Sequence, residues 1–246
     1  MPVKKQRIDL LLASRGFFEN SALAARAVMA GKVRVEDRCV DKPGTLVSEE
    51  AALMVDVPAK FASRGGLKLE AALDRFGVSP DGRVCLDIGA STGGFTDCLL
   101  QRGAMFVHAV DVGKGLLDWR LRNDARVRSH EGVNARFLEG SPFDPVPQMA
   151  VGDVSFISLT QILPPVFEIL PAGSDLVFLI KPQFEAPKNA EMPGGVVRDP
   201  ELRKSCVQKI RRCVESLGHQ WIDEMESPVP GRDGNIEHLA HLRSRD

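Results

Sequence analysis

The sequence predicts an α/β fold in which a doubly wound, mostly parallel sheet follows a small α+β module. From Leu67 onward, short apolar runs alternate with amphipathic segments, and parallel strands require helical crossovers of this kind. Before that point, two short helical patterns precede stretches of period-two alternation, which are typical of short strands. With 246 residues, 43% of them hydrophobic and 26% charged, the chain is long enough to bury a core in each part.

The front module begins with two predicted helices. The first, QRIDLLLASRGF over residues 6–17, has apolar residues at helical spacing and stops at Gly16. The second, NSALAARAVMAGK over residues 20–32, starts with an Asn-Ser cap and stops at Gly31. Residues 32–47 and 53–57 alternate between apolar and polar side chains around turn residues, which predicts short strands.

Positive charge is concentrated in this module. Residues 1–35 carry seven basic and two acidic side chains, although the whole chain has a formal net charge of −1. Such an excess favours a polyanionic partner, and the alternative is a solvated surface with a chance excess of cations.

The order of these elements resembles the alpha-L RNA-binding domain of a ribosomal protein, of pseudouridine synthases and of tyrosyl-tRNA synthetases. The helix pair, the arginine in the second helix and the Gly-Lys-Val entry to the first strand carry the resemblance. We therefore expect an RNA-binding domain over residues 1–59, in which basic side chains neutralise backbone phosphates. The basic residues expected to bind RNA are Arg7, Arg15, Arg26, Lys32, Arg34 and, just beyond this domain, Arg64.

A joint and a second domain follow. The stretch PAKFASRGG combines a proline, small residues and two glycines, and we place the linker at residues 60–66 and the second domain at residues 67–246. Predicted strands in this domain are residues 84–89, 106–112, 149–156 and 175–181, and two edge strands at 221–228 and 236–243. Predicted helices are residues 67–77, 93–103, 116–124, 157–170 and 200–218.

A glycine-rich turn, DIGASTGGF, follows the first strand of the second domain, and such turns let a nucleotide cofactor approach the backbone closely. Asp111 ends the next strand, at a separation where a carboxylate can bind ribose hydroxyls. Because Asp87 precedes the first glycine and would repel a pyrophosphate, the turn favours the cationic S-adenosylmethionine over NAD. The turn residues expected to contact this cofactor are Asp87, Gly89, Ser91, Gly93, Gly94 and Phe95.

Two of these expectations have plain structural alternatives. The glycine turn could pack without binding any ligand. For Phe95, we expect packing beneath the loop more than stacking on an adenine ring.

Charged residues end two later strands. The run LVFLIK carries Lys181 at its end, and Pro182 stops further ladder pairing. The run AVGDVSF carries Asp153 at its end, near the expected donor site. Because ligands bind beyond the carboxyl ends of parallel strands, this cation and this carboxylate are predicted to face one crevice. A purely structural ion pair is the alternative.

The order of motifs resembles the TlyA family of bacterial rRNA 2′-O-ribose methyltransferases, whose catalytic half is FtsJ-like. The motifs are SRGGLKLEAAL, LDIGASTGGFTDCLL, AVDVGKGLLDWRLRND, EGVNARFL, DVSFISL, LIKPQFEA, GGVVRD and GNIEHL. The resemblance implies a seven-stranded Rossmann-like methyltransferase sheet, S-adenosylmethionine as the methyl donor and a cytidine of 16S or 23S rRNA as the acceptor. It also implies a catalytic tetrad, which matches Lys68, Asp153, Lys181 and Glu237.

The tetrad suits the chemistry of a ribose hydroxyl, which is a poor nucleophile that gains from a base and from in-line alignment. We assign Lys181 as the base, Lys68 and Glu237 as orienting groups, and Asp153 as the carboxylate that places the lysines. A lysine base requires a lowered pKa, and we expect Lys68 to act as the neighbouring cation that lowers it.

Two other functions remain as alternatives: membrane lysis, because members of this family have been described as haemolysins, and a catalytically silent ribosome-assembly factor. The longest apolar runs are a handful of residues, far short of the roughly 20 that span a bilayer. The five cysteines form no C-x-x-C pair, so we expect no metal. We expect a cytoplasmic monomer that acts on ribosomal subunits and binds no membrane.

Overall fold

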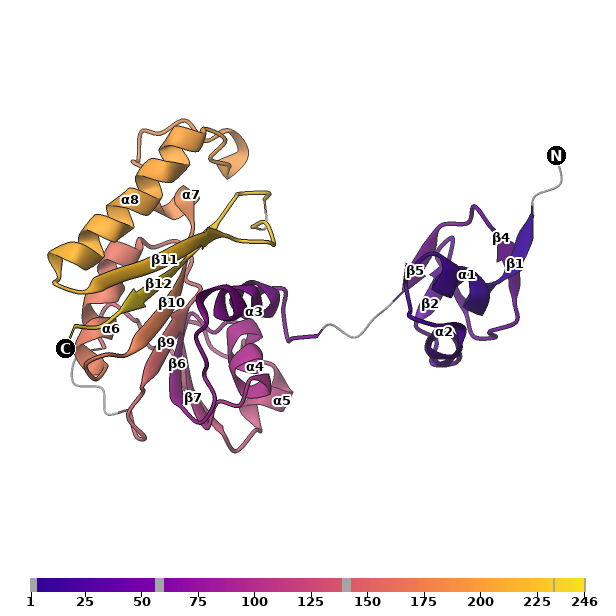
Figure 1. The fold of residues 1–246 in the computed structure, drawn as a ribbon, viewed down its shortest axis with the longest axis horizontal. Coiled ribbons are helices and arrows are strands. Elements are labelled where there is room, and N and C mark those ends of the chain that lie inside the picture. The colour runs from indigo at the N-terminus through magenta and orange to yellow at the C-terminus, as the bar shows by residue number, and fades with distance from the viewer. Residues whose placement is uncertain (1–3, 56–59, 139–142, 232, 246) are drawn as a thin grey trace. The chain divides into compact units, whose positions relative to one another are not determined.

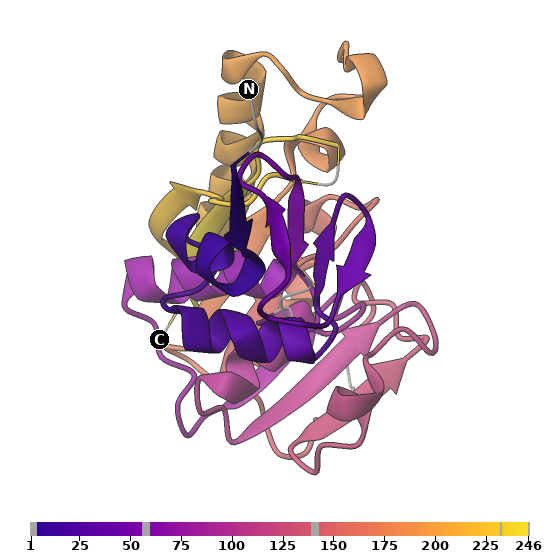
Figure 2. The same cartoon turned by 90° about the vertical axis from the view of Figure 1, so that its right-hand side faces the viewer.

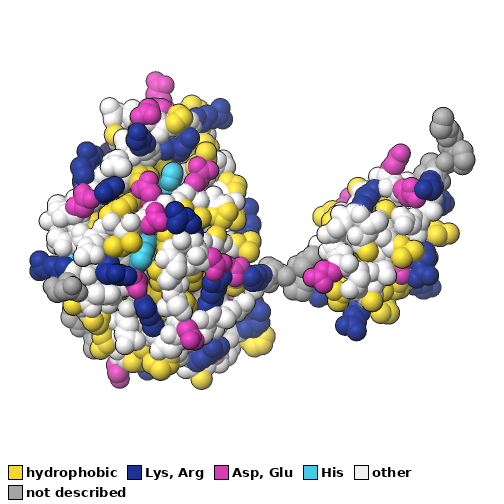
Figure 3. Space-filling view, in the orientation of Figure 1, with side chains coloured by type: hydrophobic (Ala, Val, Ile, Leu, Met, Phe, Trp, Pro, Cys, Tyr) yellow, Lys and Arg dark blue, Asp and Glu magenta, His cyan; other side chains and the backbone are white. Residues whose placement is uncertain are grey.

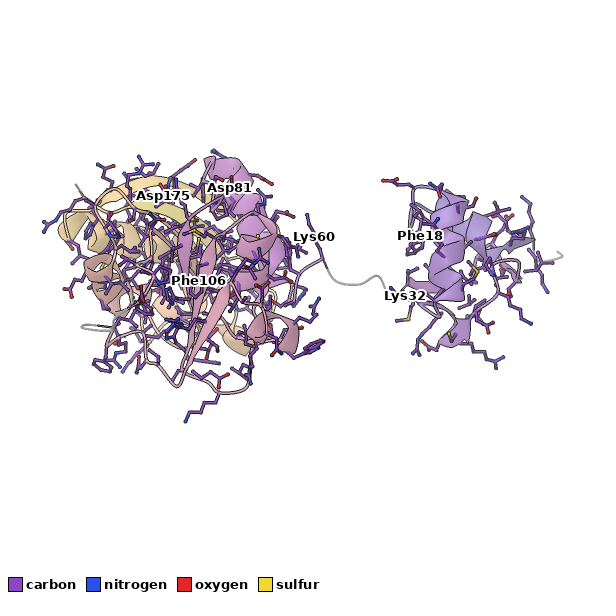
Figure 4. All side chains as sticks on the ribbon, turned by 90° about the horizontal axis from the view of Figure 1, so that it is seen from below. Phe18, Lys32, Lys60, Asp81, Phe106 and Asp175 are labelled. Atoms are coloured by element: carbon purple, nitrogen blue, oxygen red, sulfur yellow. The ribbon has the colours of Figure 1, made fainter. Side chains whose placement is uncertain are left out.

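The computed structural model describes residues 4–55, 60–138, 143–231 and 233–245, and the chain divides into two compact units, Met1–Ala59 and Lys60–Asp246. Figure 4 labels Phe18 and Lys32 in the first unit and Lys60, Asp81, Phe106 and Asp175 in the second. Residues 60–66, which we predicted as a linker, belong to the second unit, where Phe61 is buried. Residues 56–59 lie outside the described part of the chain.

The first unit packs two helices against short strands. In order, its elements are β1 (Lys5–Arg7), α1 (Ile8–Ser14), α2 (Ser21–Met29), β2 (Val33–Val35), β3 (Arg38–Val40), β4 (Leu46–Ser48) and β5 (Leu53–Val55). Strands β1 and β4 form one sheet, and β3, β2 and β5 form another. Figure 2 shows α1 and α2 side by side next to these strands.

The predicted helix signals of the first unit are confirmed. The Asn20 side chain accepts a hydrogen bond from the Leu23 amide at 3.0 Å and so caps α2. Gly31 has φ +68°, a conformation that ends the helix at little steric cost because glycine has no Cβ. Ile8, Leu12 and Val28 are fully buried between the helices and the strands, which gives this unit its own core.

The second unit is built on a seven-stranded sheet with the order β11-β12-β10-β9-β6-β7-β8. The strands are β6 (Val84–Ile88), β7 (Phe106–Asp111), β8 (Val127–Glu131), β9 (Met149–Gly152), β10 (Asp175–Ile180), β11 (Gln220–Glu226) and β12 (His238–Arg243). All neighbouring pairs from β10 to β8 are parallel, and β12 runs antiparallel to both β10 and β11. The predicted fold class, a mostly parallel α/β sheet with a small α+β module in front, is confirmed.

Helices cover both faces of this sheet (Figure 1). They are α3 (Gly65–Phe76), α4 (Gly94–Gln101), α5 (Trp119–Arg122), α6 (Leu163–Ile169), α7 (Pro182–Glu185) and α8 (Pro200–Ser216), with 3₁₀ turns at Leu159–Gln161 and Pro193–Gly195. Side chains of β10 alternate between the two layers: Val177 and Leu179 join the core with α3 and α4, whereas Phe178 and Ile180 join the core with α6 and α8. None of the described helices is long and apolar enough to cross a membrane.

Two predicted elements need correction, and one strand was missed. Strand β12 is not an edge strand, because it lies between β10 and β11 and its residues 239–242 are buried. Strand β8 was not predicted, since its sequence VRSHE is mostly polar. The predicted helix over residues 157–170 is a 3₁₀ turn followed by the shorter α6, because Pro164 and Pro165 fit only in the first turn of a helix.

Candidate active site

A cavity of about 660 Å³ opens at the carboxyl ends of the parallel strands, where ligands of open α/β sheets bind. The loops after β6, β9 and β10, the start of α3 and the loop between β11 and β12 line it. The four charged residues predicted as a tetrad all lie in this lining: Lys68, Asp153, Lys181 and Glu237. The structure therefore brings together four side chains that are far apart in the sequence.

Lys181 and Asp153 form the first of two lysine–carboxylate pairs in this cavity. The Nζ atom of Lys181 lies 2.6 Å from Asp153 Oδ1 and donates a hydrogen bond to Ser155 Oγ at 2.8 Å. Pro182 occupies the first position of α7, where its missing amide donor is not needed, and the chain leaves the sheet there. The proline thus ends β10 and leaves Lys181 at the cavity wall.

Lys68 and Glu237 form the second pair. Lys68 Nζ lies 2.5 Å from Glu237 Oε2, and both residues are buried, at 7% and 2% exposure. Gln183 Nε2 donates a longer hydrogen bond, at 3.4 Å, to the other carboxylate oxygen of Glu237. A buried carboxylate is costly without such partners, so Glu237 is held in one orientation. We expected Lys68 to accompany Lys181 as a neighbouring cation, and the structure gives each lysine a carboxylate of its own.

The glycine turn between β6 and α4 brings the backbone close to its neighbours. Gly89 has φ +79°, and a Cβ there would lie 2.7 Å from the carbonyl oxygen of Asp153. A Cβ on Gly94 would collide with the Ser63 hydroxyl, so the segment before α3 can cross the turn only at a glycine. Gly93 packs instead against Leu117 and does not line the cavity, whereas Gly89, Ser91 and Gly94 do.

Asp87 lies beneath the turn and not in the lining of the cavity. Its carboxyl group is fully buried and accepts a hydrogen bond from Thr96 Oγ1 at 2.6 Å. Burial raises the pKa of Asp87 to about 7. The other oxygen of Asp87, Oδ1, is buried and accepts no hydrogen bond from any described residue.

Asp111 holds the same turn from the end of β7. One oxygen of its carboxylate accepts the Ser91 amide at 2.8 Å, and the other accepts the Gly113 amide at 2.7 Å. It faces a small hollow next to the turn and not the large cavity. Phe95 also lines the cavity, but at 3% exposure it packs in the core beneath the loop.

These residues fit a cationic, amine-bearing cofactor. A carboxylate, Asp153, stands in the cavity wall, and Asp87 Oδ1 beneath the turn accepts no hydrogen bond from any described residue, so a bound ammonium or sulfonium would be favourable near these two carboxyl groups. Among the described residues, no group of three or more His, Cys, Asp or Glu side chains is arranged to hold a metal ion.

The six predicted RNA-binding residues have different surroundings. Arg7 forms an ion pair with Asp9 at 2.6 Å, and Arg15 donates to the backbone oxygens of Ala51 and Glu49. The described residues offer no hydrogen-bond or ion-pair partner to the side chains of the last four: Arg26, Lys32 and Arg34 in the first unit, and Arg64 at the cavity of the second.

Sequence reasoning missed three side chains of this site. Ser155 bonds the Lys181 ammonium, Gln183 bonds Glu237, and Phe156 stands at the cavity with 91% of its surface exposed. Ser155 and Phe156 follow directly after Asp153 in the sequence GDVSF, and Gln183 follows Lys181 in IKPQ, so their proximity to predicted residues was the available signal.

Comparisons with known proteins agree with this architecture. The FtsJ-like methyltransferase family matches residues 61–244, and the S4 domain matches residues 6–53. The 16S/23S rRNA (cytidine-2′-O)-methyltransferase TlyA of Mycobacterium tuberculosis is 43% identical, over 98% of this chain and 91% of that protein. Hemolysin A of Brachyspira hyodysenteriae is 42% identical, over 96% of this chain and 99% of that protein. A solved structure described as a hemolysin from Streptococcus thermophilus is 42% identical with a TM-score of 0.75, and covers 99% of this chain and 90% of its own.

Proposed function

The chain belongs to the FtsJ-like methyltransferase family, in the branch that includes TlyA, and from this premise we propose that it methylates a ribose 2′-hydroxyl of ribosomal RNA. The observation that carries the proposal is the meeting of two lysine–carboxylate pairs in one cavity beside the glycine turn. The name of the Mycobacterium tuberculosis relative, a 16S/23S rRNA (cytidine-2′-O)-methyltransferase, supports a cytidine as the target, in 16S rRNA, 23S rRNA or both.

S-adenosylmethionine is the donor that the cavity residues fit best. When bound, it supplies a methyl group made electrophilic by a sulfonium. The residues that would hold it are the turn residues Gly89, Ser91 and Gly94, with Asp153 near its positive charge and Asp111 beside the turn. Asp87 supports the turn from below through Thr96.

Lys181 is the base in this proposal. In its neutral amine form, the Nζ atom beside Ser155 and Asp153 accepts the proton of the ribose hydroxyl and becomes an ammonium, which Asp153 stabilises, as the oxygen becomes the nucleophile. Because Asp153 and Ser155, both in the loop directly after β9, fix the position of Nζ, the hydroxyl can be aligned against this wall of the cavity. Lys68 and Glu237 are fixed by their own buried ion pair, and in this proposal they orient the ribose.

The first unit supplies the affinity for RNA. Its match to the S4 domain and its exposed basic side chains support contacts to backbone phosphates, which position an RNA without reading its sequence. We infer that ribosomal subunits are the substrate, that the protein acts as a cytoplasmic monomer, and that the reaction needs neither a metal nor a membrane.

The names of the relatives also include haemolysins, and membrane lysis would require a different activity from the one that this cavity supports. Dye release from vesicles by purified protein separates the two functions: lysis would release dye without S-adenosylmethionine, and methyl transfer would not. A catalytically silent assembly factor would bind subunits and transfer no label.

The experiment that tests the proposal is tritiated methyl transfer to purified ribosomal subunits, with the modified nucleotide mapped afterwards. Wild-type protein should label rRNA at a ribose 2′-oxygen. Lys181→Ala should lose roughly 10²-fold or more of the rate, as removal of a general base does, while calorimetry shows unchanged S-adenosylmethionine binding. Equal rates for the variant and the wild type would remove Lys181 from the mechanism, and absence of any label would end the proposal.

A further inference from the structure

A second hollow adjoins the catalytic cavity. This groove, of about 790 Å³, is lined by the loop after β9, by α7 and the residues after it, and by α8. It shares two aromatic residues, Phe156 and Phe184, with the catalytic cavity, and their rings lie 5.1 Å apart. The Lys181 ammonium lies 5.9 Å from the centre of the Phe184 ring, so this ring pair separates the catalytic base from the groove.

The charged residues that line the groove are three cations and one carboxylate: Lys188, Lys209, Arg212 and Glu185. Glu185 is 3% exposed, and it accepts hydrogen bonds from the Leu159 amide at 2.7 Å and from Lys209 Nζ at 2.9 Å. The carboxylate is therefore already neutralised within the protein. Lys188 and Arg212 are both exposed, and neither has an ion-pair partner in the described part of the chain.

Helix α8 presents this charge along one face. Ser205, Lys209 and Arg212 follow the helical spacing of four and three residues, and all three line the groove. Lys204 and Arg211 lie on the same helix outside the lining, and Arg211 pairs with Glu215 at 2.9 Å. In the space-filling view, Lys and Arg side chains lie along the part of the second unit where α8 runs (Figure 3).

We propose that this groove binds the phosphates of the RNA strand next to the target nucleotide, with Lys188 and Arg212 as the phosphate ligands. The proposal rests on the proposed function, because it takes the ribose beside Lys181 to be part of a chain. A ribose within a strand carries a phosphate on each side, so the polyanion must leave the cavity along its rim. The groove offers unpaired cations next to an exposed aromatic residue, the combination typical of sites for single-stranded nucleic acid.

Lys209 acts differently from the other two cations. Its ammonium lies between Glu185 and Ser158, so its first role is to neutralise the buried Glu185 carboxylate. That carboxylate in turn binds the Leu159 amide, at the start of the 3₁₀ turn Leu159–Gln161. Replacing Lys209 would leave that carboxylate without its cation and would disturb the fold as well as the groove. The test therefore leaves Lys209 in place.

The experiment compares two double variants of the full chain, K188A/R212A and the matched control K204A/R211A. Each removes one lysine and one arginine, so the change in net charge is the same. Binding of a labelled single-stranded oligoribonucleotide and of purified ribosomal subunits is measured by equilibrium titration at several salt concentrations. Loss of two phosphate contacts should reduce the slope of log affinity against log salt by about 1.4 in K188A/R212A, and the control should keep the wild-type slope.

An unchanged slope in K188A/R212A, or an equal loss in both double variants, would overturn the proposal. If an acidic peptide competes with the oligoribonucleotide and binds as tightly or more tightly, the groove belongs to a protein partner, and the proposal is also overturned. The binding assay needs no methyl transfer, so its outcome is separate from that of the proposed function. If the salt slope changes as expected but the protein transfers no methyl group, only the proposed function fails. If the protein methylates rRNA and the slope of K188A/R212A is unchanged, only the proposal for the groove fails.

Discussion

At the end of β6, the carboxyl group of Asp87 combines full burial with a position under the glycine turn. Burial is the main cause of its raised pKa, and the nearby Asp153 carboxylate adds to the effect, while the hydrogen bond from Thr96 opposes it. The folded protein therefore holds a proton on Asp87 at pH values where the unfolded chain would release it.

Because of this residue, the free energy of unfolding should decrease as the pH rises. The pKa of Asp87 rises from an ordinary 3.8 to about 7 on folding, so its contribution is complete below pH 4 and is lost as the pH rises through 7. Asp87→Asn keeps an oxygen for Thr96 and cannot ionise. Urea unfolding measures the free energy of unfolding of both proteins from pH 5 to 8. Across that range, the difference between variant and wild type should shift in favour of the variant by on the order of a few kcal/mol. Parallel pH curves for the two proteins would contradict this assignment.

Individual side chains also mark where sequence reading ends. The sequence gives Arg15 and Arg26 the same chemistry, yet Arg15 donates to backbone oxygens 34 and 36 residues away and Arg26 does not. Likewise, Asp111 was predicted to face a ribose, and both of its oxygens bind amides of the neighbouring loops. The bonds of Arg15 and the bond between Asp111 and the Ser91 amide depend on tertiary contacts that no local pattern encodes.

Among the elements, the turn between β6 and α4 has the tightest steric requirement that bears on the site. Gly89 and Gly82 both have positive φ, +79° and +68°, so alanine is strained at either position. They differ in their surroundings, because a Cβ on Gly82 meets nothing within 4 Å, whereas a Cβ on Gly89 meets the Asp153 carbonyl oxygen. The two glycines form a matched pair that separates backbone strain from crowding.

Gly82→Ala should cost about 1–2 kcal/mol of unfolding free energy, the price of a left-handed conformation alone. Gly89→Ala should cost about 1–3 kcal/mol more, since the new methyl group forces the ends of β6 and β9 apart. Chemical denaturation of both variants measures the difference. Methyl transfer should fall only for Gly89→Ala, because Asp153 is the residue displaced. Equal losses of stability in the two variants would show that the close approach has no cost.

Elements with a strong pattern could be predicted, and elements without one could not. The apolar runs of β6, interrupted only by Asp87, and of β10 after Asp175 predicted buried strands whose ends carry the site, because parallel strands align their carboxyl ends. Strand β8 has a polar sequence, since it pairs only with β7 at the edge of the sheet. The insertion of β12 between β10 and β11 is a property of topology, and alternation within residues 238–243 carries no information about which neighbour they join.

On the scale of the whole molecule, charge and function divide between two units that each bury a core of their own. The first 35 residues have an excess of five positive charges, whereas the whole chain has a net charge of −1. The second unit holds the complete tetrad and the glycine turn. The sequence could predict this division from composition and motif order, while the pairing of each lysine with its own carboxylate required the fold.

Residues 60–246 produced alone should fold and bind the methyl donor, because every residue of the cavity lies in that unit. They should methylate ribosomal subunits at least about tenfold less efficiently, through a raised KM for RNA, since loss of the basic unit removes several phosphate contacts. Circular dichroism, calorimetry with S-adenosylmethionine and methyl-transfer kinetics measure the three quantities. A full-length variant with Arg26, Lys32 and Arg34 changed to alanine serves as the control, and it should raise KM in the same direction while leaving kcat unchanged. If the shortened protein keeps the KM of the full chain, the first unit has no part in binding the substrate, and the cavity with its groove supplies all of the affinity for RNA.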